Sequence, residues 1–447
     1  MRPATAKNSF QEYPPVQKRL KHLIAASTVL GGLAVPQIAS AGGFYLQEQS
    51  VRGAGRAFSG EVADTGAASL WWNPAAIGGI DQIEGHFALS VILPSADIEN
   101  DNTLIVRPQQ GPAPVGGDQL SKDPIETGIL PAGAIAVPLG ERLSVGLAVS
   151  SPYSFTTDYD ETSWVRYTAL KSELRTYDIQ PSVAYMVTPE LSVGAALNIE
   201  YSDATLTNAL PNLSAQLPDG EQALEGDGWD LGWSAGVQYR TGPLTLGASY
   251  KSSVKHNLDG ELTQSGLLGP LAGQNRVVET GATFRTPWHA MIGARYAMTP
   301  QLTLNTQVNR IGWGEFDAIR LGDPINSAIR ENYRNTWSYA AGIDYAVSPQ
   351  WTVRGGIQYD ETPTQNGDRD ARVPDGDRWN FALGTSYDVS PGFTVDAAFN
   401  YLAIETASID RTTAAYAGSP VQTPILVDGT ARDANALIFS VGGRIAF

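Results

Sequence analysis

The sequence predicts an all-β protein, a 14-stranded antiparallel transmembrane β-barrel whose N-terminal segment forms a plug. Three observations lead to this prediction. Apolar and polar residues alternate in segments of about nine to eleven residues, the length that a tilted transmembrane strand needs. The connections between these segments are alternately short and long, as in outer-membrane barrels. Tyrosine and tryptophan recur at both ends of the segments, where they would lie at the two membrane interfaces.

The composition excludes several classes of protein. The chain has 447 residues, of which 42% are hydrophobic and 17% are charged, and its formal net charge is -16. Such an acidic chain is not a nucleic-acid binder that depends on phosphate contacts, so we expect no nucleic-acid partner. Its 0 cysteines exclude disulfide frameworks, cysteine-ligated zinc and thiol catalysis. We expect no cofactor and no metal, because the acidic loop 368–377 lacks the spacing of an EF-hand.

The beginning of the chain has the order of a secretory signal peptide. Basic residues between 18 and 21 precede the apolar run Leu23 to Val35, and Ala39-Ser40-Ala41 supplies the small residues of a cleavage site. The apolar run is shorter than the roughly 20 residues of a membrane-spanning helix. We therefore assign residues 1–41 to a signal peptide and expect export. A buried N-terminal helix is the alternative.

The strand pattern begins after residue 82. In 379–388, Trp379, Phe381 and Leu383 share one face, while Asn380 and Ala382 lie on the other. An alternation of this kind predicts a strand with lipid on one side and a lumen on the other. The segments that follow it are 83–93, 129–139, 141–150, 175–187, 191–201, 231–240, 244–254, 287–297, 302–311, 337–347, 351–360, 379–388, 393–403 and 437–447.

A repeat marks the short connections. Tyr185, Tyr239, Tyr296, Tyr345 and Tyr387 each stand four residues before the proline of a short turn. We expect these tyrosines to ring the periplasmic interface, and outward tryptophans and tyrosines at the opposite strand ends to form a second girdle. A soluble sandwich is the alternative, but it does not explain two aromatic bands in register. The long connections are predicted at roughly 94–128, 151–174, 202–230, 255–286, 312–336, 361–378 and 404–436.

Residues 42–82 match no strand template, although they precede the first strand. They are mostly small and apolar and are rich in glycine. Fourteen strands enclose more room than their own side chains fill. We therefore expect 42–82 to be a plug inside a barrel formed by 83–447.

Several motifs of this plug resemble a known family. Gly42-Gly43-Phe44, the block that begins Gly53-Ala54-Gly55-Arg56, and Asn73-Pro74-Ala75 resemble the N-terminal hatch of the long-chain fatty acid transporters of Gram-negative outer membranes. The similarity continues through Gly232-Trp233-Ser234-Ala235-Gly236, Tyr250-Lys251-Ser252 and Pro374-Asp375-Gly376-Asp377-Arg378-Trp379. The family includes channels for aromatic hydrocarbons. The resemblance implies that a hydrophobic ligand is caught among extracellular loops and passes to a lumen pocket near the mature N-terminus.

The resemblance also implies that the ligand leaves sideways, through a kink in the third strand beside the Asn-Pro-Ala turn. In this sequence the third strand is 141–150, and Gly146 and Pro152 are the residues expected to kink it, because proline cannot donate to a strand ladder. We assign Asn73, Pro74 and Ala75 to the hatch beside this exit. The alternative for Asn73 is a purely local turn cap.

The candidate ligand-binding residues come in three pairs. Phe44 and Leu46 would enter the pocket, or would only pack the plug. Trp313 and Phe316 would form an apolar groove at the base of a long loop, or would anchor the girdle. A carboxylate ligand needs a cation or several hydrogen-bond donors. The family's lumen-facing basic residue maps near Arg330, so we assign Arg330 and Arg334 to this role, with pairing to loop acids such as Glu331 as the alternative.

We expect passive transport of hydrophobic compounds across the Gram-negative outer membrane, with long-chain fatty acids as the first candidate and aromatic hydrocarbons as the second. A general porin and an outer-membrane lipase are further alternatives; a lipase would need a serine converging on His86 or His289. We expect no enzymatic activity. The expected partners are the hydrophobic ligand, outer-membrane lipid, lipopolysaccharide and the barrel-assembly machinery, and the expected state is a monomer.

Overall fold

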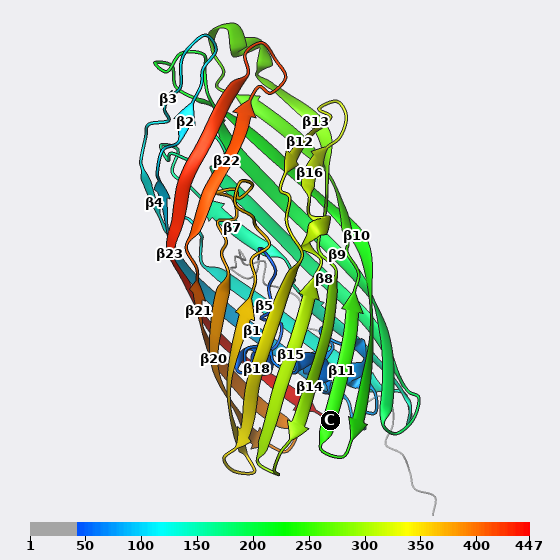
Figure 1. Ribbon diagram of the computed structural model, residues 1–447. Coiled ribbons are helices and arrows are strands. Elements are labelled where there is room, and N and C mark those ends of the chain that lie inside the picture. Colours follow the sequence, from blue (N-terminus) through cyan, green and yellow to red (C-terminus); the bar gives the residue numbers. More distant parts are fainter. Residues whose placement is uncertain (1–42) are drawn as a thin grey trace, which may run out of the picture. The chain divides into compact units, whose positions relative to one another are not determined.

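The computed structural model describes residues 43–447, which belong to one compact unit. The predicted signal peptide, 1–41, lies outside the described residues. The chain forms a closed antiparallel barrel (Figure 1). Closure is made by β1 (Glu84–Asn100) and β23 (Thr423–Ala446), which pair from Glu84↔Ala446 to Asn100↔Gly429. The prediction of a 14-stranded barrel with an N-terminal plug is confirmed.

Several wall strands consist of two consecutive segments that an irregular residue or short loop separates. In chain order the wall is formed by β1, β5 (Gly128–Pro138), β6 (Leu143–Ser150) with β7 (Ser154–Asp158), β8 (Lys171–Met186), β9 (Leu191–Leu210), β10 (Gly220–Thr241), β11 (Leu244–Lys251) with β12 (Lys255–Ser265), β13 (Arg276–Arg285) with β14 (His289–Ala297), β15 (Leu302–Ile311) with β16 (Ala318–Leu321), β17 (Ser327–Arg330) with β18 (Thr336–Ala346), β19 (Trp351–Asp360), β20 (Arg378–Ser390), β21 (Phe393–Ile404) with β22 (Ala407–Ala415), and β23. Between these strands lie β2 (Leu104–Ile105), β3 (Ala113–Pro114), β4 (Leu120–Lys122), η4 (Gly269–Gln274) and η5 (Trp313–Glu315).

The long connections are shorter than predicted, because the hairpins continue past the apolar part of each strand. β9 and β10 pair from Tyr239↔Leu191 to Gly220↔Leu210, so the connection expected at 202–230 is reduced to 211–219. In these extensions the outward face no longer meets lipid, and polar residues such as Glu221 and Glu225 are exposed on it. The period-two apolar signal therefore disappears while the ladder continues. Figure 1 shows the extensions rising toward one end of the barrel, with short turns at the other.

The two faces of the wall differ as the alternation predicts. On β20, Trp379, Phe381 and Leu383 are exposed on the outside by 42%, 46% and 65%, whereas Asn380 and Ala382 are buried in the lumen. The repeated tyrosines of the short-turn end also face outward; they are Tyr185, Tyr239, Tyr296, Tyr345 and Tyr387. An apolar outer surface with aromatic bands suits a wall surrounded by lipid.

The hatch, defined here as residues 43–82, consists of short turns of helix inside the barrel, toward the end with the short turns (Figure 1). Its elements are α2 (Val51–Ala54), η1 (Glu61–Ala63), η2 (Ala67–Ser69) and η3 (Pro74–Ile77). From Gly43 to Gly78 every residue except Arg52 and Thr65 is buried. Hatch and wall approach closely through backbone at several points, and at one of them a Cβ on Gly55 would lie 2.8 Å from the Cα of Gly384. Within residues 43–447, no helix has the length and apolar content needed to cross a membrane.

Candidate functional site

The third wall strand is broken. β6 pairs with β8 from Leu143↔Tyr185 to Ser150↔Asp178, and β7 resumes the pairing at Ser154↔Arg175. Between them, residues 151–153 turn away from the ladder, and the backbone of Tyr153 bonds to the hydroxyl of Thr176 instead. On the other side, β5 pairs with β6 only over Gly133–Pro138. Among the described residues, Gly128–Ala132 therefore have no ladder partner in the third strand.

The first described residues of the chain pair with this break from inside the barrel. The amide of Leu46 donates to the carbonyl of Pro152 at 2.8 Å, and the amide of Ser154 donates to the carbonyl of Phe44 at 3.1 Å. These bonds place Tyr45 opposite Tyr153 as an antiparallel pair. The side chain of Gln49 adds a bond to the carbonyl of Ser151 at 3.0 Å. Residues 44–46 thus act as a short strand against the broken wall.

The break lies at Pro152, and Gly146 does not contribute to it. Gly146 pairs regularly with Ala136 and Ser182, so the prediction that it kinks the third strand is wrong. Its missing side chain has another consequence: a Cβ there would lie 2.7 Å from a methyl group of Leu70 and 3.0 Å from one of Ile77. Glycine at this position makes room for the hatch against β6.

The hydrogen bonds of the Asn-Pro-Ala turn go to β9 and β10, although η3 also packs against β6 through Ile77. Asn73 caps η3 by accepting from the amide of Ala75 at 2.9 Å, and its amide group donates to the carbonyls of Val62 at 2.7 Å and Val237 at 3.2 Å. The carbonyl of Ala75 accepts from the hydroxyl of Ser192 at 2.9 Å. Val237 is on β10 and Ser192 on β9. Within the described residues the Asn73 side chain makes no hydrogen bond to the third strand, and the turn fixes the hatch to β9 and β10.

An apolar cavity lies next to the break. Phe44 and Phe155 line one side of it, with their ring centroids 5.6 Å apart. Phe155 is on β7, immediately after the break. The rest of the lining is mostly aliphatic and aromatic and comes from the extended strands and the loops above them; it includes Leu174, Leu206, Leu224, Leu258, Phe284 and Phe316.

The predicted ligand-binding residues divide between this cavity and its support. Phe44 and Phe316 line it. Trp313 is fully buried with its ring 4.7 Å from that of Phe44, which it supports from behind. Leu46 packs in a separate cluster with Ile92 and Leu130 of the wall.

The two arginines do not reach the cavity. The side chain of Arg330 is exposed, and the backbone carbonyl of this residue accepts a hydrogen bond from Arg411 at 2.8 Å. Arg334 is exposed and donates to the carbonyl of Thr362 at 3.1 Å. Neither arginine therefore belongs to the lining of this cavity, where a carboxylate would need it. The residues of this segment that line the cavity are Glu331 and Tyr333.

The electrostatic surroundings of Glu331 are unusual for a ligand pocket. It lies in the loop between β17 and β18 and is only 6% exposed. Burial, reinforced by the negative charge of Asp370, raises the pKa of Glu331 to about 8, against the opposing effect of Arg411. The surroundings therefore disfavour a negative charge at this point of the cavity lining, whether it belongs to Glu331 or to a ligand.

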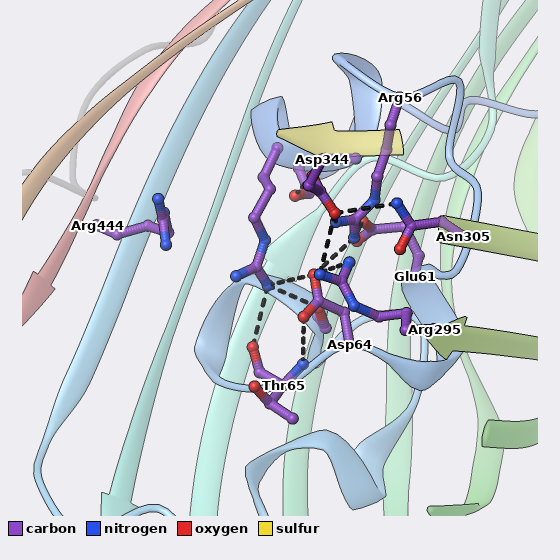
Figure 2. A network of polar contacts seen from close by, with 12 residues as sticks. Arg56, Glu61, Asp64, Thr65, Arg295, Asn305, Asp344 and Arg444 are labelled. Carbon is purple, nitrogen blue, oxygen red and sulfur yellow. Dashed lines mark hydrogen bonds and ion pairs between the residues drawn. The ribbon is translucent and has the colours of Figure 1, made fainter. Parts of the chain in front are cut away.

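A group of polar residues joins the hatch to the wall (Figure 2). Arg56 of the hatch is fully buried, bonds to Glu61, and reaches Asp64 at 2.6 Å and Asp344 of β18 at 3.3 Å. Arg295 of β14 joins the same two aspartates, at 3.1 and 3.0 Å. We call Arg52, Arg56, Glu61, Asp64, Arg295, Asn305, Asp344 and Arg354 the hatch–wall network. Arg444 stands apart in Figure 2 and pairs with Asp396 at 2.8 Å.

The sequence reasoning missed this network. The sequence places Arg56 and Glu61 in the hatch motif and Arg354 on the lumen face of its strand, so it indicates the part of the barrel in which each residue lies. Nothing in the sequence shows which lumen positions the hatch touches, because the hatch has no periodicity of its own.

A closed barrel with an apolar outer face, an internal hatch and an apolar cavity beside a broken wall strand is the architecture of an outer-membrane transport protein. The family model of the outer membrane protein transport proteins (OMPP1/FadL/TodX) matches residues 32–447. The chain therefore belongs to this family, as the hatch motifs indicated, and its predicted location in the Gram-negative outer membrane is confirmed.

Curated and solved proteins agree with this assignment. The chain is 27% identical over 372 residues to a long-chain fatty acid transport protein of Escherichia coli O6:H1, an alignment covering 75% of this chain and 81% of that protein. It is 28% identical over 383 residues to a 47 kDa outer membrane protein of Pasteurella multocida, covering 80% and 85%.

Two crystal structures show the same fold. A Pseudomonas aeruginosa FadL homologue superposes with a TM-score of 0.80 at 23% identity, covering 91% of this chain and 100% of that one. The toluene transporter of Ralstonia pickettii superposes with a TM-score of 0.62 at 18% identity, covering 89% and 98%.

Proposed function

We propose that this barrel carries hydrophobic compounds passively across the outer membrane, from the extracellular loops through the cavity and out through the break in the third strand. The observation that carries the proposal is the double role of Phe44. Its side chain lines the cavity, and its carbonyl belongs to the pairing that covers the break from inside. Withdrawal of residues 43–46 would therefore join the cavity to the opening in the wall.

The physical chemistry of an apolar solute favours this route. Each buried CH₂ group contributes about 0.8 kcal/mol, so a cavity lined by leucine and phenylalanine binds an alkyl or aryl body without further chemistry. A sideways exit past Gly128–Ala132 would deliver the solute into lipid. A straight passage through the lumen would require it to re-enter water and to displace the whole hatch.

The parts of the chain have separate roles in this proposal. Residues 1–41 direct export, 42–82 close the lumen, and 83–447 form the wall. Phe44 and Phe316 contact the ligand, while Leu46 and Trp313 hold the N-terminal segment in place. Asn73, Pro74 and Ala75 fix the hatch to β9 and β10, and Pro152 keeps the wall open by interrupting the ladder.

Two substrate classes are candidates. Long-chain fatty acids are named for the curated relative from Escherichia coli, and toluene is named for the solved transporter from Ralstonia pickettii. The test is uptake by a strain that lacks this protein, complemented with the native chain, on oleate and on an aromatic hydrocarbon. We expect restored uptake of at least one of them. Reconstituted protein should give no swelling of liposomes in small sugars; ready sugar flux would make it a general porin.

We also propose that the chain is a transporter without enzymatic activity. His289, a candidate for a lipase site, bonds to the hydroxyl of Tyr153 at 2.9 Å. Ser202 and His256 are hydrogen bonded at 2.9 Å, but both are fully buried and neither lines the cavity, so an ester has no access to them. Esterase activity that is lost in Ser202→Ala would refute this. We further propose a monomer, inserted by the barrel-assembly machinery among outer-membrane lipid and lipopolysaccharide.

A further inference from the structure

The cavity contains a buried carboxyl group without a hydrogen-bond donor. Glu331 lines the cavity, and among residues 43–447 no group donates a hydrogen bond to its carboxylate. The nearest cation is Arg411, whose Nη1 lies 4.0 Å from the Glu331 carboxylate. A ligand that covers this carboxyl group removes it from water and is therefore favoured if it supplies a hydrogen-bond donor in exchange.

The cations around the cavity are already engaged. Arg411 holds Asp370 at 2.6 Å, and Arg372, which lines the cavity, holds the same carboxylate at 2.7 Å. Asp370 is itself buried. Turning either arginine toward a ligand would weaken the pairing of a buried charge, which is costly.

The other acids at the edge of the cavity do not present their carboxylates to a ligand. Glu173 is paired outside the cavity with Lys171 at 3.0 Å and Arg175 at 2.9 Å, and Glu225 lies on the exposed, outward face of β10. Tyr333 adds one neutral hydroxyl to the lining. Among residues 43–447, a carboxylate head would thus meet the Glu331 carboxyl group in an apolar surrounding and no cation that is not already paired with an acid.

We propose that the cavity selects apolar compounds whose polar head donates a hydrogen bond, such as an alkylphenol or a long-chain alcohol, over the corresponding carboxylates, with Glu331 as the acceptor. The inference rests on the proposed function, since it assumes that the cavity holds the transported compound. A cavity of this kind differs from a pure hydrocarbon pocket, whose affinity would not increase when the ligand carries a hydroxyl group. It also differs from a fatty-acid site, which would present a cation to the carboxylate.

The test compares three ligands with the same alkyl chain: 4-hexylphenol, hexylbenzene and 4-hexylbenzoate. Each is titrated at neutral pH against the native protein in lipid nanodiscs carrying the uncharged fluorophore N-phenyl-1-naphthylamine, with empty nanodiscs as the partition blank. A hydrogen bond to a carboxyl group gives about a tenfold gain in affinity. We expect the phenol to displace the fluorophore at about one-tenth of the concentration of hexylbenzene, and the benzoate to be the weakest.

Variants assign the effect to Glu331. In Glu331→Leu the phenol should lose its advantage over hexylbenzene. Glu331→Gln keeps an acceptor and should keep part of the advantage, while binding the benzoate better than the native protein does. The matched control is Glu221→Gln, which neutralises an exposed acid on the outward face of β10 that does not line the cavity and should leave the order of the ligands unchanged.

The outcomes separate this inference from the function on which it rests. Equal binding of all three ligands, tighter binding of the benzoate, or a phenol advantage that persists in Glu331→Leu would overturn the role of Glu331 while leaving a hydrophobic-ligand cavity intact. Failure of all three ligands to displace the fluorophore from the native protein would contradict the proposed function itself.

Discussion

Replacing Arg56 by methionine removes the central cation of the hatch–wall network at nearly constant side-chain length. Arg56 is fully buried, and Glu61 and Asp64 of the hatch and Asp344 of the wall surround it. Arg295 still pairs with both aspartates in the variant, but Glu61 loses its ion-pair partner. Breaking a buried ion pair by removing one partner costs about 3–5 kcal/mol. Since the network spans hatch and wall, Arg56→Met should shift the equilibrium from docked toward released hatch by roughly 100- to 4,000-fold.

Hydrogen exchange measures this shift directly. Amides of α2 and η1 should exchange faster in Arg56→Met by about the same factor, while amides of the wall strands keep their native rates. The matched control is Arg320→Met, which breaks the half-exposed pair of Arg320 with Asp317 and should leave hatch exchange unchanged, because exposed pairs contribute about 0–1 kcal/mol. Hatch exchange at the native rate in a folded Arg56→Met barrel would refute the anchoring role of the network.

Three further predictions concern the hatch. Burial raises the pKa of Glu48 to about 7, so the docked hatch binds the Glu48 proton more tightly than the released hatch does. The free energy of docking should therefore weaken by up to about 3 kcal/mol as pH rises from about 4.5 to 7, and should change little above pH 7. Glu48→Gln should flatten this dependence of hatch exchange, measured relative to intrinsic rates, and an unchanged slope would contradict the assignment. Gly384→Val should push α2 away from β20 and weaken hatch docking by about 1–3 kcal/mol. The control Gly355→Ala, whose Cβ would meet only atoms at 3.8 Å, should leave docking unchanged. Equal hydrogen exchange of the hatch in both variants would show that the contact between Gly55 and Gly384 is not tight. Asn73→Ala removes the hydrogen bonds to Val62 and Val237 and should weaken hatch docking by about 1–3 kcal/mol. Amides of 62–77 should then exchange faster, while those of 44–46 keep their native protection. A uniform loss of protection over the hatch would contradict a local anchor at β10.

The wall could be predicted from the sequence because lipid imposes a strict pattern on it. Trp379, Phe381 and Leu383 must face outward and their neighbours inward, so period two fixes both the strand and its phase. Beyond the lipid this requirement ends, and the extensions of β9 and β10 were missed although their ladder continues to Leu210 and Gly220.

The site could be predicted only in part, for the same reason. Phe44 and Phe316 were recognised as apolar residues at places where a pocket was expected, and both line the cavity. The family resemblance places the basic residue only near Arg330. In an extended segment, a shift by one residue moves a side chain from the lumen face to the outer face. The inward residue is Glu331, so the expected cation is replaced by an acid. The hatch has no period at all, which is why the partners of Asn73 could not be derived.

The most direct test of the proposed route is a disulfide that fixes the N-terminal segment to the break. The chain has 0 cysteines, so Tyr45→Cys with Tyr153→Cys creates a single defined bridge between residues that already form an antiparallel pair. The control bridge is Ser90→Cys with Ser440→Cys, which joins β1 to β23 where the two hydroxyls lie 2.7 Å apart and does not involve the hatch. Uptake of the hydrophobic substrate should stop in the oxidised 45–153 variant, return on reduction, and continue in the oxidised control. Undiminished uptake with the 45–153 bridge closed would contradict the sideways route.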